Sequence, residues 1–259
     1  APQALGKPMI NLLPINQDEK IHTIMPMPED EGSWADLQII FATKNGNIRR
    51  NQLSDFTNIR QNGKIAMKLN ETDELVSVLP CNDKDNILLA TRLGKAIRFD
   101  VNDVRVFVGR GSSGVRGVRL KPKDIVVSMS LIPDTQEKYV LSVTENGFGK
   151  RTPVDDYRKT NRGGQGVANI ECSTRNGPVV ASYVASENDQ IMLVTNSGKL
   201  IRIRVNGGEG DKIRIAGRKT QGVRLFDVDE GEKVVSVALL NENDDEAYDD
   251  KIKNTSDEN

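Results

Sequence analysis

Residues 39–50 read Ile-Ile-Phe-Ala-Thr-Lys-Asn-Gly-Asn-Ile-Arg-Arg, and this pattern decides the fold because the chain repeats it four times. The β-branched and apolar run before Thr43 is typical of a buried strand. The Asn45-Gly46 pair predicts a type I′ hairpin turn, which needs positive φ at both central positions. The copies share Thr-x-x-Gly-x-x-x-Arg, and their arginines are Arg50, Arg98, Arg151 and Arg202.

The repeat predicts an all-β, propeller-like array of blades. The motif glycines are spaced by 48, 53 and 51 residues, which is the size of one four-stranded blade. A second motif alternates with the first and supplies further strands; its glycines are Gly6, Gly63, Gly114, Gly166 and Gly222. The 259 residues therefore hold about four and a half blades. Two packed β-sandwiches are the alternative, although sandwich strands need not repeat in sequence.

The charges divide the chain into a body over 1–240 and an acidic tail over 241–259. The tail holds eight acids and two lysines, whereas residues 41–240 hold 32 basic and 23 acidic residues. An acidic tail on a basic body is a pattern of nucleic-acid proteins. We expect the tail to be disordered, and either to compete with DNA for the body or to serve only solubility.

The sequence offers no device for catalysis, metal binding or a cofactor. His22 is the only histidine, and Cys81 and Cys172 have neither zinc spacing nor a disulfide framework. Residues 109–114 fit GxGxxG, but a strand-like alternation follows where a dinucleotide site needs a helix. No apolar run approaches the roughly 20 residues that span a bilayer. Because the two cysteines give no disulfide framework, we expect a cytoplasmic, reducing compartment.

The repeated arginines point to a nucleic-acid surface. If the blades are arranged radially, equivalent residues form a curved basic track for the phosphates of a bent duplex. Glycine-rich loops let a backbone approach phosphate while an arginine binds it bidentately. Aromatic residues make up only 4% of the chain, which disfavours a stacking platform for single strands. In the alternative interpretation, each motif arginine pairs with an acid of the neighbouring blade.

The candidate DNA-binding residues comprise the four motif arginines, the basic residues beside them and those of the glycine-rich loops. Those beside the motif arginines are Arg49, Lys95, Lys150, Lys199 and Arg204. Those of the loops are Arg110, Arg116, Arg162, Arg218 and Lys219.

These motifs resemble those of the C-terminal domain in the A subunit of DNA gyrase and, more loosely, those of its counterpart in topoisomerase IV. The resemblance covers residues 6 to about 240 and rests on motifs in the same order, including residues 6–14, 114–120, 144–152 and 217–223. It implies a six-bladed β-pinwheel whose basic outer rim wraps duplex DNA and so supports supercoiling.

The resemblance also implies which parts of the enzyme lie elsewhere. Strand cleavage belongs to another domain of the same polypeptide, and ATP and Mg belong to other parts of the holoenzyme, which includes the B subunit of gyrase. The implied location is the cytoplasm, at the nucleoid. Two alternatives are a topoisomerase IV domain that directs substrate choice and a propeller scaffold for protein partners.

One departure concerns the box Gln-Arg-Arg-Gly-Gly-Lys-Gly in the first blade of the family, after which this chain is expected to begin. The nearest match is residues 160–166, which keep Arg162, Gly163, Gly164 and Gly166. Asn161 and Gln165 stand where the box has basic residues. We interpret this stretch as a degenerate box that still contacts phosphate.

Overall fold

A computed structural model describes residues 11, 13, 21–25, 27–57, 59, 63–133, 138–206 and 213–240. They form strands β1–β16 in four sheets, with short 3-10 helices between them. This confirms the predicted all-β class. The predicted tail over 241–259, and about half of the residues before residue 38, where the half-blade is predicted, lie outside the described residues.

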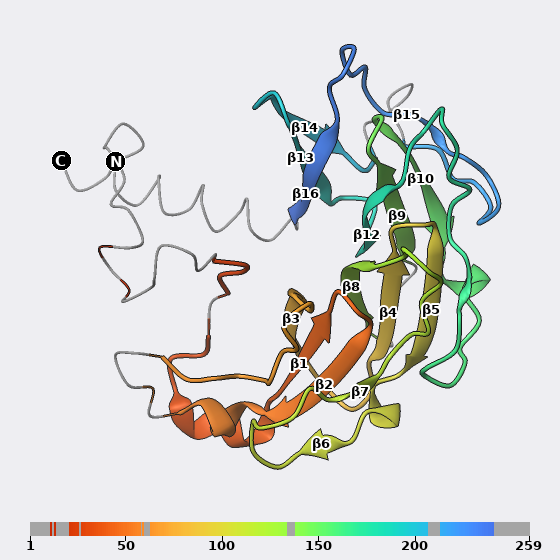
Figure 1. Ribbon diagram of the computed structural model, residues 1–259. Helices are drawn as coiled ribbons and strands as arrows, with labels where there is room; N and C mark the ends of the chain where they lie inside the picture. Colours follow the sequence, from red (N-terminus) through yellow and green to blue (C-terminus); the bar gives the residue numbers. More distant parts are fainter. Residues whose placement is uncertain are drawn as a thin grey trace.

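The four sheets follow one another along the chain as blades I to IV, which curve in an arc (Figure 1). Blade I contains β1 (Gln38–Thr43), β2 (Asn47–Gln52) and β3 (Leu75–Cys81). Blade II contains β4 (Asn86–Thr91), β5 (Lys95–Asp100) and β8 (Val126–Ile132). Blade III contains β9 (Tyr139–Thr144), β10 (Phe148–Pro153) and β12 (Val179–Ala185). Blade IV contains β13 (Gln190–Thr195), β14 (Leu200–Arg204) and β16 (Val234–Leu240).

Each Thr-x-x-Gly motif forms a hairpin turn that brings two strands of a blade together. The amide of Gly46 donates to the carbonyl of Thr43 at 2.9 Å, and the other three turns close in the same way. Gly46 has φ +84°, but Asn45 does not have positive φ. The predicted type I′ turn is therefore wrong. The glycine alone takes the left-handed conformation, as in a turn that ends in a glycine bulge.

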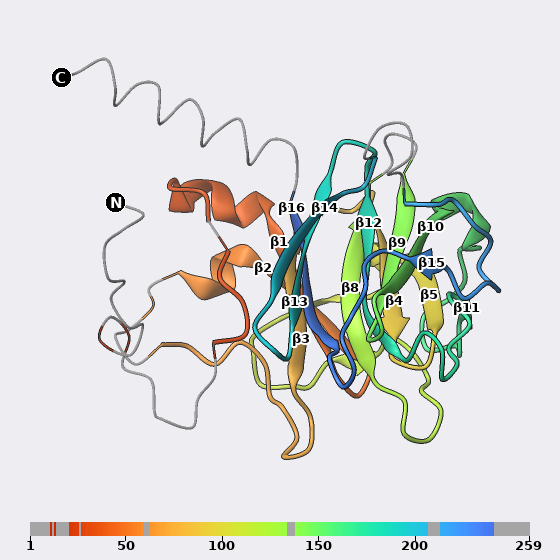
Figure 2. The ribbon, with the colours of Figure 1, turned by 90° about the horizontal axis from the view of Figure 1, so that it is seen from above.

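The outermost strand of a blade comes from the next blade along the chain. We call the chain between a blade's hairpin and its third strand the crossover segment. The crossover segment of blade II carries β6 (Val106–Phe107) and β7 (Val115–Arg116), which pair with β2 of blade I. Likewise, β11 (Val167–Ala168) pairs with β5, and β15 (Val223–Arg224) pairs with β10. In the view from above, β11 and β15 lie farther out than β8 and β12 (Figure 2).

The hydrophobic core lies between successive blades, so the central strands are buried on both faces. In β4, Ile87 and Leu89 pack in the cluster toward blade I, whereas Leu88 and Ala90 pack in the cluster toward blade III. Main-chain hydrogen bonds repeat at each junction between blades, at the first residue of the third strand. The amides of Val126, Val179 and Val234 donate to carbonyls of the preceding blade at 2.9, 2.9 and 2.8 Å.

The short 3-10 helices mostly follow the second strand of a hairpin, where the chain leaves the sheet. They are η2 (Glu31–Asp36), which precedes β1, and η3 (Leu53–Phe56), η4 (Val101–Asp103) and η5 (Val154–Asp156). Trp34 of η2 and Met67 cover the face of blade I that is turned away from blade II, beside Phe41.

The strand exchange depends on a glycine that starts each donated strand. Gly114, Gly166 and Gly222 have φ of +84°, +70° and +79°. A Cβ on Gly114 would lie 2.3 Å from the carbonyl oxygen of Ile48 in the accepting strand. Gly63 holds the same place in the repeat, with φ +75°, but a Cβ there meets no described atom within 4 Å.

We therefore expect Gly114→Ala to lower the free energy of unfolding by about 3 kcal/mol or more, because backbone strain and a steric clash add together. Gly63→Ala is the matched control and should cost only about 1–2 kcal/mol, the strain alone. Urea denaturation followed by circular dichroism measures both. Equal losses for the two variants would contradict this account of the exchange.

Candidate nucleic-acid interface

Three glycine-rich loops lie at equivalent places on the outer rim of the arc. We call residues 109–114, 161–166 and 217–222 the rim loops. Each belongs to a crossover segment and ends at the glycine that starts a donated strand. The crossover segments run outside β2, β5 and β10 (Figure 1). The second residue of each rim loop is an arginine: Arg110, Arg162 or Arg218.

The rim-loop arginines make one repeated contact with the preceding crossover segment. Arg110 donates to the carbonyl of Ile65 at 2.7 Å, Arg162 to that of Arg116 at 3.0 Å and Arg218 to that of Ala168 at 3.1 Å. Each acceptor lies two residues after a glycine of the second motif, at Gly63, Gly114 or Gly166. Equivalent side chains thus connect equivalent backbone positions, one blade apart.

A main-chain bond beside each of these contacts runs in the opposite direction. The amides of Lys68, Arg119 and Glu171 donate to Ser112, Gly164 and Thr220 of the following rim loops, at 3.2, 2.8 and 3.0 Å. Each rim loop is therefore attached twice to the segment before it. The result is a strip of backbone along the rim, formed by residues 63–68, 109–119, 161–171 and 217–224.

The strip carries positive charge without a carboxylate for each cation. Within the described residues, the hydrogen bonds of the three rim-loop guanidinium groups all go to backbone carbonyls. Arg116, Arg119 and Lys219 are exposed beside them. Guanidinium groups held by carbonyls keep their full charge, which suits them to bind phosphate.

The motif arginines do not form the exposed arc that the sequence analysis predicts for them. Arg50 and Arg151 are 5% and 2% exposed, and Arg98 is half-buried. Arg50 pairs with Asp83 at 3.0 Å and Arg151 with Glu187 at 3.4 Å, while Arg98 lies 3.9 Å from Asp155. Arg202 is exposed and donates to Gln190 at 2.7 Å.

The structure therefore corrects the prediction for three of the four motif arginines. Asp155, near Arg98, belongs to the next blade, as the alternative interpretation expects. Asp83 and Glu187, which pair with Arg50 and Arg151, lie instead in the linkers between blades. Burial removes Arg50 and Arg151 from any surface that a duplex could reach.

The other candidate residues divide by exposure. Arg49 and Lys150 are buried beneath rim loops, at 1% and 0% exposure, and Lys95 is half-buried. Lys199 is exposed but bonded to Asp229 and Glu232 at 2.5 and 2.9 Å. Arg204 is exposed.

In the degenerate box, the amide of Gly163 donates to the carbonyl of Gly117 at 2.6 Å, so the box contacts the preceding segment. Its contact with phosphate stays a prediction, as do the DNA contacts of the exposed basic residues.

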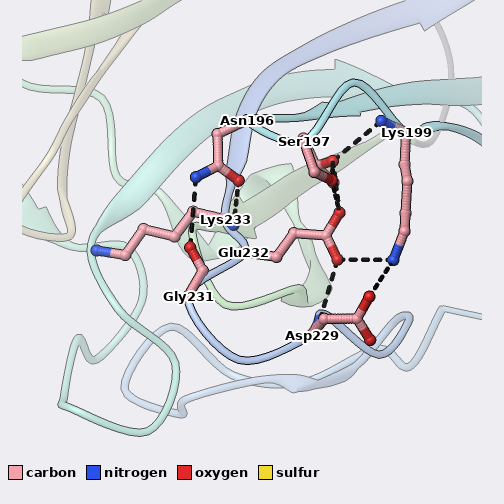
Figure 3. A network of polar contacts seen from close by, with 8 residues as sticks. Asn196, Ser197, Lys199, Asp229, Gly231, Glu232 and Lys233 are labelled. Atoms are coloured by element: carbon pink, nitrogen blue, oxygen red, sulfur yellow. Dashed lines mark hydrogen bonds and ion pairs between the residues drawn. The ribbon is translucent and has the colours of Figure 1, made fainter.

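Acids missed in the sequence anchor the hairpin turns. Asp73 accepts the amide of Asn45 at 2.9 Å, and Asp124 accepts the hydroxyl of Thr91 at 2.8 Å. Glu232 does the same in blade IV, where it accepts the hydroxyl of Thr195 at 2.7 Å. It also binds Ser197 and Lys199 (Figure 3). These hydrogen bonds, with one from the amide of Asp229, lower the pKa of Glu232 to about 2. Each acid lies about 30 or more residues from its turn, so no local signal marks it.

Four other features of the described residues bear on possible sites. No group of three or more metal-ligating side chains lies among them. No helix in this part of the chain is long and apolar enough to cross a membrane. His22 borders a cavity of about 380 Å³, with Lys44, Glu74 and Glu145. The aromatic ring of Phe148 contacts two guanidinium groups, those of Arg175 and Arg224.

We expect Glu232→Gln to lower the free energy of unfolding at pH 7. A carboxyl with a depressed pKa stabilises the fold above its unfolded pKa of about 4.5, and this contribution is lost as the pH falls toward 2. The gap between wild type and variant should therefore narrow from pH 5 to pH 2.5 in urea titrations. Glu230→Gln, in the same exposed turn, is the control and should leave the curve unchanged.

The four repeats match a known family model. The model described as DNA gyrase C-terminal domain, beta-propeller, matches residues 38–82, 85–133, 138–177 and 189–241. The A subunit of DNA gyrase from Rickettsia bellii (strain RML369-C) is 41% identical over 96% of the chain and 32% of that protein. The A subunit of DNA gyrase from Staphylococcus epidermidis (strain ATCC 12228 / FDA PCI 1200) is 39% identical over 94% of the chain and 26% of that protein.

Solved structures agree with these relatives. The C-terminal domain of DNA topoisomerase IV has a TM-score of 0.81 at 27% identity, over 92% of this chain and 71% of that one. The DNA gyrase A C-terminal domain has a TM-score of 0.78 at 27% identity, over 91% and 75%. The chain spans about a third of the length of the curated relatives that it matches. By its repeats, its fold and these matches, the chain belongs to the DNA gyrase C-terminal domain family of β-propeller domains.

Proposed function

We propose that the chain binds duplex DNA through the rim loops and bends it around the blade array. The observation that carries the proposal is the repeated contact of Arg110, Arg162 and Arg218, which places one charged loop on the rim at each of the three blade junctions. The solved relatives named above are C-terminal domains of a gyrase and a topoisomerase.

A rim of this kind recognises the phosphate backbone of DNA rather than its base sequence. Arginines on glycine-rich backbone contact phosphates, which carry no base information. Bending a 20–30 bp stretch by 40–90° costs about 1–6 kcal/mol, which several phosphate contacts must offset. Blades that curve in an arc supply such contacts in succession along one path.

In this proposal the chain is a non-catalytic accessory domain of a type II topoisomerase. DNA wrapped on it would support supercoiling by gyrase, and its partners would be the rest of the gyrase A polypeptide together with the B subunit of gyrase. ATP and Mg would bind elsewhere in that assembly, in the cytoplasm at the nucleoid. A topoisomerase IV domain that directs substrate choice is the second candidate, favoured by the TM-score of 0.81 to such a domain.

A protein scaffold remains the alternative from another class. It predicts carboxylate partners for the motif arginines, and Arg50 and Arg151 have them. It does not account for the rim loops, whose arginines bond to carbonyls and leave a positive strip. DNA binding and its salt dependence separate the two functions.

We expect the triple variant of Arg110, Arg162 and Arg218 to Ala to bind all duplex sequences more weakly. If wild type neutralises about six phosphates, the slope of log K against log salt is roughly −5. The variant lacks three phosphate contacts, so the magnitude of its slope should be smaller by about 2–3. Fluorescence anisotropy with two duplexes of unrelated sequence, across a salt series, measures both quantities.

A charge-matched control replaces Lys44, Lys84 and Lys233 by Ala. Lys44 and Lys233 line the cavity that His22 borders, and Lys84 lies in the turn between β3 and β4. This control should keep the wild-type slope. The proposal fails if wild type shows a flat salt response, or if the control loses as much affinity as the rim variant.

A further inference from the structure

Two of the rim loops each accept a hydrogen bond from a buried cationic side chain that takes no part in the proposed contacts with DNA. The side chain of Lys150 is fully buried in β10, and its Nζ donates to the carbonyl of Gly217 at 2.5 Å. Arg49, which holds the equivalent place in β2, donates to the carbonyl of Gly109. Gly109 and Gly217 are the first residues of their rim loops and directly precede Arg110 and Arg218.

The third rim loop shows what happens without this cation. In β5 the equivalent residue is Ile97, 1% exposed, which packs in the hydrophobic core. Arg162 of that loop makes an additional bond instead, from its Nε to the carbonyl of Asp103 at 2.8 Å. One position of the repeat thus accepts Arg, Ile or Lys within a common fold.

A buried ammonium next to a guanidinium is costly to the fold. Burial and the charge of Arg218 lower the pKa of Lys150 to about 8, against a smaller opposing effect of Asp156. The carbonyl of Gly217 does not need the lysine, because the hydroxyl of Thr220 also donates to it at 2.9 Å. An isoleucine would fill such a site at lower cost, as it does in blade II.

We propose that Lys150 is a positioning residue for the 217–222 rim loop, which holds the loop so that Arg218 meets a phosphate. The inference rests on the proposed function. Lys150 does not itself touch DNA, since it is fully buried. Its bond to Gly217 fixes the backbone that immediately precedes Arg218, at a cost to stability that serves binding.

The chain itself supplies the matched substitutions. Lys150→Ile copies blade II and Lys150→Arg copies blade I. We expect Lys150→Ile to keep or raise the urea midpoint, yet to weaken duplex binding by roughly two- to tenfold and to reduce the salt slope by about 1. Lys150→Arg should retain both affinity and slope. A merely structural role would lower stability and affinity together.

A double-mutant cycle of Lys150→Ile with Arg218→Ala tests whether Lys150 affects DNA binding through Arg218. If Lys150 acts through Arg218, the double variant binds no more weakly than Arg218→Ala alone. Additive losses, or wild-type affinity in Lys150→Ile, would overturn the inference.

Hydrogen exchange of residues 217–222 in the DNA-free protein separates the two proposals. Exchange should be faster in Lys150→Ile than in wild type or Lys150→Arg, because the loop loses its anchor. Unchanged exchange overturns the positioning role even if DNA binds. If exchange is faster in Lys150→Ile but the wild-type protein binds no duplex, Lys150 still positions the loop and the proposed DNA-binding function is rejected.

Discussion

The main-chain pairing between each blade and the crossover segment of the next is the interaction on which the rest of the structure depends. No blade from I to III completes its outer edge from its own sequence; β7, β11 and β15 all come from the following blade. Unpaired strand edges expose hydrogen-bonding groups that must find partners. The exchange meets this need, and it also fixes the step from one blade to the next.

That step determines the geometry of the rim. Because the donated strands start at glycines in matching backbone conformations, the loops before them leave the sheet in the same direction. The contacts of Arg110, Arg162 and Arg218 then fall at one register in three successive junctions. The backbone of the donated strands and loops therefore sets the spacing of the charges along the rim.

The sequence predicts the blades and the rim loops well, because both depend on local patterns that recur about every 50 residues. It predicts exposure poorly. In an ordinary sheet with one solvated face, alternation separates inner from outer residues. Here both faces of a sheet are covered, by a neighbouring blade or, on one face of blade I, by Trp34 and Met67. Arg50 and Arg151 are therefore buried although polar residues flank them in β2 and β10. Their partners Asp83 and Glu187, like Asp124 and Glu232 at the turns, become neighbours only through the blade register.

The choice of partner distinguishes the two sets of arginines. Arg50 and Arg151 bond to carboxylates, which neutralise their charge inside the protein. The rim-loop arginines bond to carbonyls, which orient a guanidinium by dipoles but leave its net charge unchanged. A carboxylate at Ile65, Arg116 or Ala168 would hold each loop as firmly and would cancel the positive strip. Attachment through backbone carbonyls therefore lets the fold order its outer loops while their charge stays free for an anion.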